Sequence, residues 1–218
     1  MITENLQKIK DAIPDHVTLV AVSKTKPIAD LQEAYDAGQR IFGENKIQEM
    51  VDKYDILPKD IKWHMIGHLQ SNKVKYMAHF VDLIHGVDKF KTLKEINKQA
   101  KKHDRIINCL LQAKIAEEDT KFGLSFEDIE AILVSEEFAS LKNIKVVGFM
   151  GMATFTDNTA QLEKEFASLK HFFDKQSAKN PALEILSMGM SGDYPLAIKK
   201  GSTMIRVGSS IFGSRNYN

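Results

Sequence analysis

The sequence predicts an α/β fold, namely a (β/α)8 barrel of the TIM type with an extra helix at its N-terminus. Short apolar stretches rich in β-branched residues alternate with segments of helical periodicity along the whole chain. Eight stretches read as strands, which is the strand number of that barrel. No fixed-period repeat or low-complexity linker interrupts the 218 residues. We therefore expect a single domain over residues 1–218; the alternative is an open doubly wound sheet, which more often has fewer strands.

The first segment, "MITENLQKIKDAIP", predicts the extra helix. Its apolar residues Ile2, Leu6, Ile9 and Ile13 recur at helical spacing. Charges occur throughout it, so it does not resemble a signal peptide.

The strands follow in order, each ending near a polar or glycine-containing turn. We expect them over residues 17–23, 40–43, 61–67, 80–86, 106–113, 144–151, 183–189 and 203–208.

Helical patterns fill the intervals. Gly38 follows one apolar stripe as an expected C-cap, and Asp88 precedes another as an expected N-cap. Ser125 and Asp128 have the spacing of a capping box. The longest stripe steps by four, three and four residues through Leu162, Phe166, Leu169 and Phe173.

The bulk composition excludes several classes of protein. Thirty basic and 29 acidic residues give a net charge of +1, so we expect no nucleic-acid partner. No apolar run approaches the roughly 18 residues of a membrane span. The lone cysteine, Cys109, fits a reducing compartment and lies mid-strand as a small core residue. We expect a cytoplasmic protein.

The ends of the last two strands predict a phosphate site. "SMGMSGD" and "RVGSSIFG" are rich in glycine and serine, and each precedes a short expected helix. In barrel enzymes the loops after strands seven and eight recurrently bind phosphate. Ser191, Gly192, Gly208 and Ser209 are the residues we assign to it; the alternative is two ordinary tight turns.

The end of the first strand carries an amine. Lys24 shares the alternation of Val20 and Val22, whereas Lys26 lies beyond the strand beside Pro27. An amine that loses hydration at the end of a buried strand favours its neutral, nucleophilic form and can condense with an aldehyde. Together with a phosphate site, Lys24 suggests a phosphorylated carbonyl compound such as pyridoxal 5′-phosphate. The alternative is an ordinary cation that reaches water.

Three other residues invite interpretation. Arg206 precedes Gly208 by two positions, so it could reach the far end of a ring whose phosphate lies at Gly208; alternatively it pairs with a carboxylate. His64 and His68 have the spacing of helical zinc ligands, but they fall on a strand and a turn, where that spacing has no meaning. We therefore expect no metal.

Six motifs in order resemble one family. "AVSKTKP", "FGEN", "WHMIGHLQSNK", "GFMGMAT", "LSMGMSGD" and "IRVGSSIFG" are similar to motifs of the pyridoxal-phosphate homeostasis protein family, single-domain relatives of the alanine racemase N-terminal barrel. The resemblance covers essentially the whole chain. It implies pyridoxal 5′-phosphate as cofactor, joined to Lys24 as a Schiff base, with Arg206 facing the pyridine nitrogen. It implies Lys24, Asn45, Asn72, Ser191, Arg206, Gly208 and Ser209 as cofactor-binding residues, and we expect Met188 and Gly192 beside them. Lys121 in "TKFG" resembles a lysine near the family's cofactor pocket.

The resemblance implies a cofactor-binding protein of intracellular homeostasis, a store or delivery protein with little turnover and no catalytic residues. Apo enzymes would be its recipients, and we expect a monomer. The alternative is a pyridoxal-phosphate-dependent racemase or related enzyme. The chain ends soon after Gly208, so we expect no second domain of the kind that completes alanine racemases. A third interpretation, a Schiff-base aldolase, needs a carboxylate base, for which Glu44 is the nearby residue.

Overall fold

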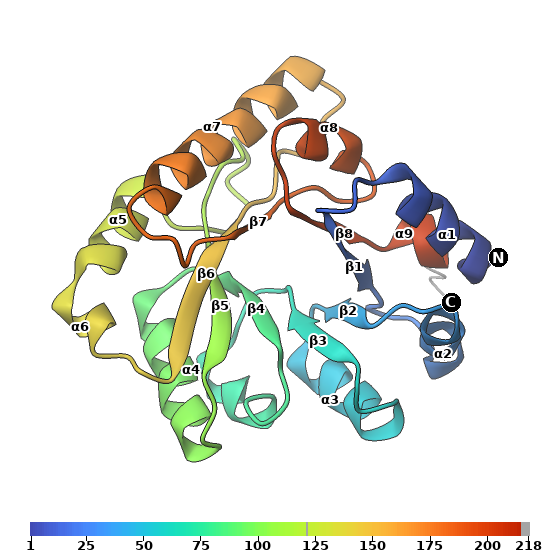
Figure 1. The fold of residues 1–218 in the computed structure, drawn as a ribbon, viewed down its shortest axis with the longest axis horizontal. Helices are drawn as coiled ribbons and strands as arrows, with labels where there is room; N and C mark the ends of the chain where they lie inside the picture. The colour runs from blue at the N-terminus through green and yellow to red at the C-terminus, as the bar shows by residue number, and fades with distance from the viewer. Residues whose placement is uncertain (121, 215–218) are drawn as a thin grey trace.

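The computed structural model describes residues 1–120 and 122–214. Its strands close into a parallel barrel in sequence order, with helices around the outside (Figure 1). The eight strands are β1 (Thr18–Val22), β2 (Ile41–Glu44), β3 (Lys62–Met65), β4 (Leu83–Val87), β5 (Ile107–Gln112), β6 (Ile144–Met150), β7 (Ile185–Ser187) and β8 (Met204–Val207). Each lies within or one residue beyond its predicted segment, so the predicted fold class is confirmed.

The helices alternate with the strands. They are α1 (Ile2–Ala12), α2 (Ile28–Asp36), α3 (Ile47–Ile56), the 3-10 helix η1 (Ser71–Tyr76), α4 (Phe90–Lys102), α5 (Phe126–Val134), α6 (Glu136–Ala139), α7 (Thr159–Ser177), α8 (Tyr194–Lys199) and α9 (Ser209–Phe212). None in the described part of the chain is both long and apolar enough to cross a bilayer.

Two of the three predicted helix ends are confirmed. Ser125 Oγ accepts a hydrogen bond from the Asp128 N–H at 3.1 Å, as an N-cap does. Gly38 follows α2 with a φ of +94°, which glycine tolerates best. The prediction for Asp88 is wrong, because α4 begins after Lys89. Asp88 Oδ2 instead lies 3.4 Å from His68 Nδ1.

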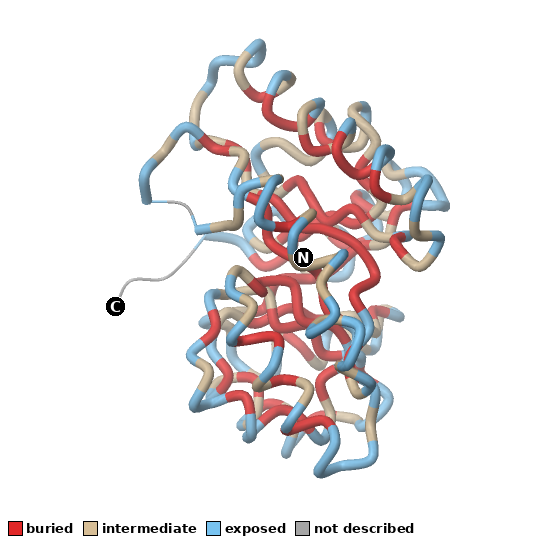
Figure 2. The backbone as a smooth tube through the Cα atoms, turned by 90° about the vertical axis from the view of Figure 1, so that its left-hand side faces the viewer, coloured by how far each residue is buried: buried red, intermediate tan, exposed pale blue. Residues whose placement is uncertain are grey.

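The barrel contains two separate apolar cores. The larger lies between strands and helices, and Figure 2 shows the buried backbone concentrated inside an exposed outer layer. The smaller lies inside the barrel, and its buried members are Val20, Leu83, Leu110, Val147, Met150 and Met204. Because side chains alternate along a strand, other inward positions on β3, β4, β7 and β8 are left to polar residues.

Strand register places residues of β1 and β8 side by side. Val20 pairs with Arg206, and Ala21 pairs with Val207. Val20 belongs to the inner core, so its partner Arg206 also faces the barrel interior. The carboxyl ends of these two strands, where Lys24 and Gly208 follow, therefore open at the same end of the barrel.

Candidate functional site

Lys24 lies in a turn two residues beyond β1, at the carboxyl end of the barrel, and its side chain is half-buried. Ser23, before it, is fully buried, and its N–H donates to the Gly43 carbonyl at 3.0 Å. The pairing of β1 with β2 thus continues to the residue that directly precedes the lysine.

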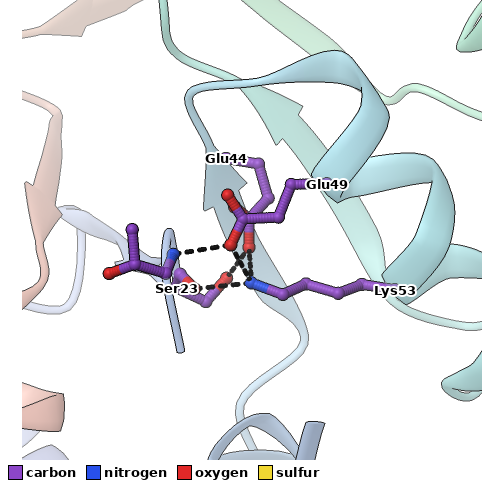
Figure 3. A network of polar contacts seen from close by, with 5 residues as sticks. Ser23, Glu44, Glu49 and Lys53 are labelled. Atoms are coloured by element: carbon purple, nitrogen blue, oxygen red, sulfur yellow. Dashed lines mark hydrogen bonds and ion pairs between the residues drawn. The ribbon is translucent and has the colours of Figure 1, made fainter. Parts of the chain in front are cut away.

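A lysine from α3 holds this turn from the outside (Figure 3). Lys53 Nζ donates to the Ser23 carbonyl and to Glu44 Oε1, both at 2.7 Å, and to Glu49 Oε1 at 2.8 Å. Glu44 Oε1 also accepts from Ser23 Oγ at 2.6 Å. The Lys53 charge is buried, so these acceptors replace its hydration.

The same cluster fixes the residue after Lys24. The Thr25 N–H donates to Glu49 Oε1 at 2.5 Å, and Thr25 has a φ of +64°. Both chain neighbours of Lys24 are therefore held by side chains of α3. Burial raises the pKa of Glu44 to about 7, against the opposing effects of Lys53 and Ser23. Glu44 Oε1 thus joins the Ser23 hydroxyl to the Lys53 ammonium and helps to hold the turn that carries Lys24.

Lys26 has a different environment from Lys24. Its Nζ donates to the carbonyls of Phe212, Gly213 and Ser214, each at 3.1 Å. These carbonyls end α9, where a cation is favoured. Lys26 thus links the first loop of the barrel to the end of the described chain.

The loops after β7 and β8 meet, as the sequence predicts. The Gly208 N–H donates to Ser191 Oγ at 3.2 Å. Ser209 begins α9 and is exposed, and the Ile211 N–H donates to the carbonyl of the N-cap residue Gly208 at 2.9 Å. Gly192 is exposed, with open space where a Cβ would lie. A Cβ on Gly208 would lie 3.1 Å from the Val22 carbonyl, so these donors lie against the end of β1.

Arg206 is buried inside the barrel, on the face that leads up to these loops. Its Nη1 donates to Ser187 Oγ at 2.5 Å, and its Nη2 donates to the Gly151 carbonyl at 3.1 Å. Burial lowers the Arg206 pKa to about 10, which leaves the guanidinium charged at neutral pH. The nearby charge of Asp193 acts in the opposite direction and favours the charged form of Arg206.

Of the remaining predicted residues, two lie at the carboxyl ends of strands, one lies on the exposed surface of η1, and one is outside the described residues. Asn45 is half-buried at the end of β2, where its carbonyl lies against Gly67 after β3. Met188 is fully buried after β7. Asn72 is exposed on η1, and no hydrogen bond joins its side chain to the described site residues. Lys121 lies outside the residues that the structure describes.

The side chains of His64 and His68 have different surroundings. His64 faces the barrel interior, whereas the His68 ring stacks on Phe122 with ring centroids 4.1 Å apart. Within residues 1–120 and 122–214, no three histidine, cysteine, aspartate or glutamate side chains form a group that could hold a metal ion.

Sequence reasoning missed the residues that support the site. Lys53 and Glu49 hold the Lys24 turn, and Ser187 holds Arg206. One signal was available for the first pair, since a Glu and a Lys four residues apart on a helix lie side by side. Nothing in the local sequence indicates that Ser187 meets Arg206.

The comparisons with known proteins find similar sequences and similar folds. Residues 1–216 match the family described as alanine racemase, N-terminal domain. The chain is 39% identical to the pyridoxal phosphate homeostasis protein of Haemophilus influenzae over 223 residues, which cover 97% of this chain and 93% of that protein.

Solved structures are similar over the same length. PipY of Synechococcus elongatus has 36% sequence identity and covers 98% of this chain and 100% of its own, with a TM-score of 0.92 without PLP and 0.88 with PLP bound. An alanine racemase of Clostridium difficile reaches a TM-score of 0.82 at 14% identity, over 57% of its own chain. At that identity the similarity concerns the fold alone.

Proposed function

Because the chain belongs to the pyridoxal phosphate homeostasis protein family, with the alanine racemase N-terminal fold, we propose that it binds pyridoxal 5′-phosphate (PLP) and stores or delivers it within the cell. The cofactor would lie at the carboxyl end of the barrel, in the single domain that we propose for residues 1–218. Lys24 would hold its aldehyde carbon covalently, and the loops after β7 and β8 would hold its phosphate.

One observation carries this proposal. The Gly208 N–H and the Ser191 hydroxyl, assigned to one phosphate from the sequence, lie within hydrogen-bond distance of each other. Gly208 follows the buried cation Arg206 by two residues and lies against the end of β1, the strand that leads to Lys24. Oriented donors suit a phosphate, a cation that only donates suits a pyridine nitrogen, and a primary amine can condense with an aldehyde.

The donor set fits PLP in chemistry as well as in position. Bound PLP supplies an aldehyde that condenses with amines and a ring that withdraws electrons. The Arg206 guanidinium would donate to the ring nitrogen and disfavour a proton there, which weakens that withdrawal. Gly208 and Ser191 would orient the phosphate end, with Asn45 and Met188 lining the site.

The same arrangement supports a carrier over an enzyme. A racemase needs an acid–base group on each face of its substrate, and Lys24 would serve one face only. We therefore propose little or no turnover, a monomeric protein, and apo PLP enzymes as recipients of the cofactor. The alternative is a PLP-dependent racemase.

The test is a comparison of two lysine variants. Wild-type protein loaded with PLP should be yellow, and reduction with borohydride followed by peptide mapping should find the label on Lys24. Lys24→Met should abolish this absorbance and the label. Lys26→Met is the matched control and should keep both, since the Lys26 amine bonds the carbonyls that end α9. A label on another lysine, or equal spectra for wild type and Lys24→Met, would contradict the proposal.

A further inference from the structure

A line of hydrogen-bonding groups runs through the barrel interior behind the candidate site. Arg206 Nη1 lies 2.5 Å from Ser187 Oγ, which lies 2.9 Å from His85 Nδ1. His85 Nε2 lies 2.9 Å from His64 Nδ1, and His64 Nε2 lies 3.4 Å from Asp82 Oδ2. The line starts near the carboxyl ends of β7 and β8, crosses to β4 and β3, and ends at Asp82, directly before β4.

The chemistry of the two end groups fixes every proton along the line. The guanidinium of Arg206 only donates, and the ionised carboxylate of Asp82 only accepts. His64 therefore donates from Nε2 and accepts at Nδ1, which makes His85 Nε2 a donor and its Nδ1 an acceptor. Ser187 then accepts from Arg206 and donates to His85. Only one set of neutral tautomers satisfies all five groups.

The inner groups of the line are shielded from bulk solvent. Ser187 and His85 are fully buried, and His64 is 2% exposed. Burial lowers the pKa of His64 and lowers that of His85 well below its ordinary value, where His64 and Arg206 act in the same direction. Asp82 lies at the exposed end of the line, and its hydrogen bond with His64 lowers its pKa. Ser187, His85 and His64 are thus neutral groups between the buried cation of Arg206 and the ionised carboxylate of Asp82.

We propose that Ser187, His85 and His64 are positioning residues that hold the Arg206 guanidinium in one orientation toward the pyridine nitrogen of bound PLP. The inference rests on the proposed function, since the cofactor gives that orientation its use. A guanidinium plane is set by at least two of its contacts. Here one is the Gly151 carbonyl and the other is Ser187, whose hydroxyl can point only to His85 while it accepts from Arg206.

The first measurement needs no cofactor. Long-range ¹H–¹⁵N NMR spectra of the apo protein at neutral pH distinguish the histidine tautomers, with assignments from single His→Gln variants. We expect His64 and His85 to be neutral and protonated at Nε2. An Nδ1–H tautomer or an imidazolium at either residue would overturn the line.

The second measurement cuts the line and follows the cofactor. Ser187→Ala removes one hydroxyl, and we expect about tenfold weaker PLP binding, since a hydrogen bond to a charged group is lost, together with a shifted absorbance maximum of bound PLP. Cys109→Ala is the matched control, because it removes one heavy atom from an equally buried residue on the outward face of β5. It should leave affinity and spectrum unchanged.

A double variant tests whether the residues act together. His85→Leu should reproduce the effect of Ser187→Ala, and the pair combined should lose no more affinity than the larger single loss, because members of one network are not additive. Additive losses, or an unchanged affinity and spectrum in Ser187→Ala, would overturn the positioning role alone. Failure of the wild-type protein to take up PLP would overturn the proposed function and this inference with it.

Discussion

At the scale of single residues, the position of Lys24 depends on the residues on either side of it. Thr25 is β-branched, and its left-handed backbone costs roughly 1–2 kcal/mol relative to an ordinary conformation. Two hydrogen bonds offset that cost: the Thr25 N–H donates to Glu49, and Lys53 donates to the Ser23 carbonyl. Such backbone strain often occurs at functional sites, and here it lies next to the candidate nucleophile Lys24.

The Glu44 carboxyl predicts a pH dependence of stability. Its pKa is raised from 4.5 to about 7 in the folded protein, so folding favours the protonated form. This contribution to the free energy of unfolding is fully present below pH 4.5 and is lost as the pH rises to about 7. The Glu44→Gln variant cannot titrate at this position, so it should not lose this stability as the pH rises. Its free energy of unfolding, relative to that of the wild type, should therefore increase on the order of 1–3 kcal/mol between low and neutral pH.

Urea unfolding of both proteins at about pH 5 and about pH 7.5 measures this difference. Other groups titrate in the same interval, but they are common to both proteins and cancel in the comparison. Parallel stability profiles of the variant and the wild type would contradict the raised pKa.

At the scale of elements, the loops after β7 and β8 are held together before any ligand binds. The Arg206 N–H donates to the Gly189 carbonyl at 2.9 Å, and the Gly208 N–H donates to Ser191 Oγ at 3.2 Å. Gly189 has a φ of +102°, and a Cβ there would lie 2.7 Å from the Ala197 Cβ, so this turn requires glycine. The donors of the candidate phosphate site are therefore preorganised by the turns that join the strands to α8 and α9.

These loops give a second test of the phosphate assignment. Ser191→Ala combined with Gly208→Val should weaken PLP binding about tenfold or more, because a hydroxyl donor is lost and the new side chain occupies the space beside Val22. Equilibrium dialysis of PLP measures the loss. Ser177→Ala, at the far end of α7, is the control and should bind as wild type does. Unchanged affinity in the double variant would refute the assignment.

At the scale of the whole molecule, the barrel interior is divided between two kinds of residue. Apolar side chains from β1, β4, β5, β6 and β8 fill part of it. The rest holds Arg206, Ser187, His85 and His64, whose polar atoms are satisfied mainly by one another. Such a network is stable only when complete, so it constrains the barrel to one register near the candidate site.

The proposed contact between Arg206 and the ring nitrogen predicts the catalytic behaviour of the molecule. Because Arg206 would disfavour a protonated pyridine in that complex, we expect negligible racemisation of L-alanine by PLP-loaded protein in a chiral assay. An alanine racemase assayed in parallel is the positive control. Saturable turnover that disappears in Lys24→Met would favour the racemase alternative.

The sequence by itself determined the order of the strands, the helices between them and the positions of Lys24, Ser191 and Gly208 at strand ends. Periodicity and turn residues act over a few neighbours, so they can be read locally. Only the tertiary structure decided which polar side chains meet. Lys53 reaches the Ser23 carbonyl across 30 residues and Ser187 meets His85 across 102. Closure of the barrel brings them together, because inward-facing groups of distant strands must satisfy one another where water is excluded.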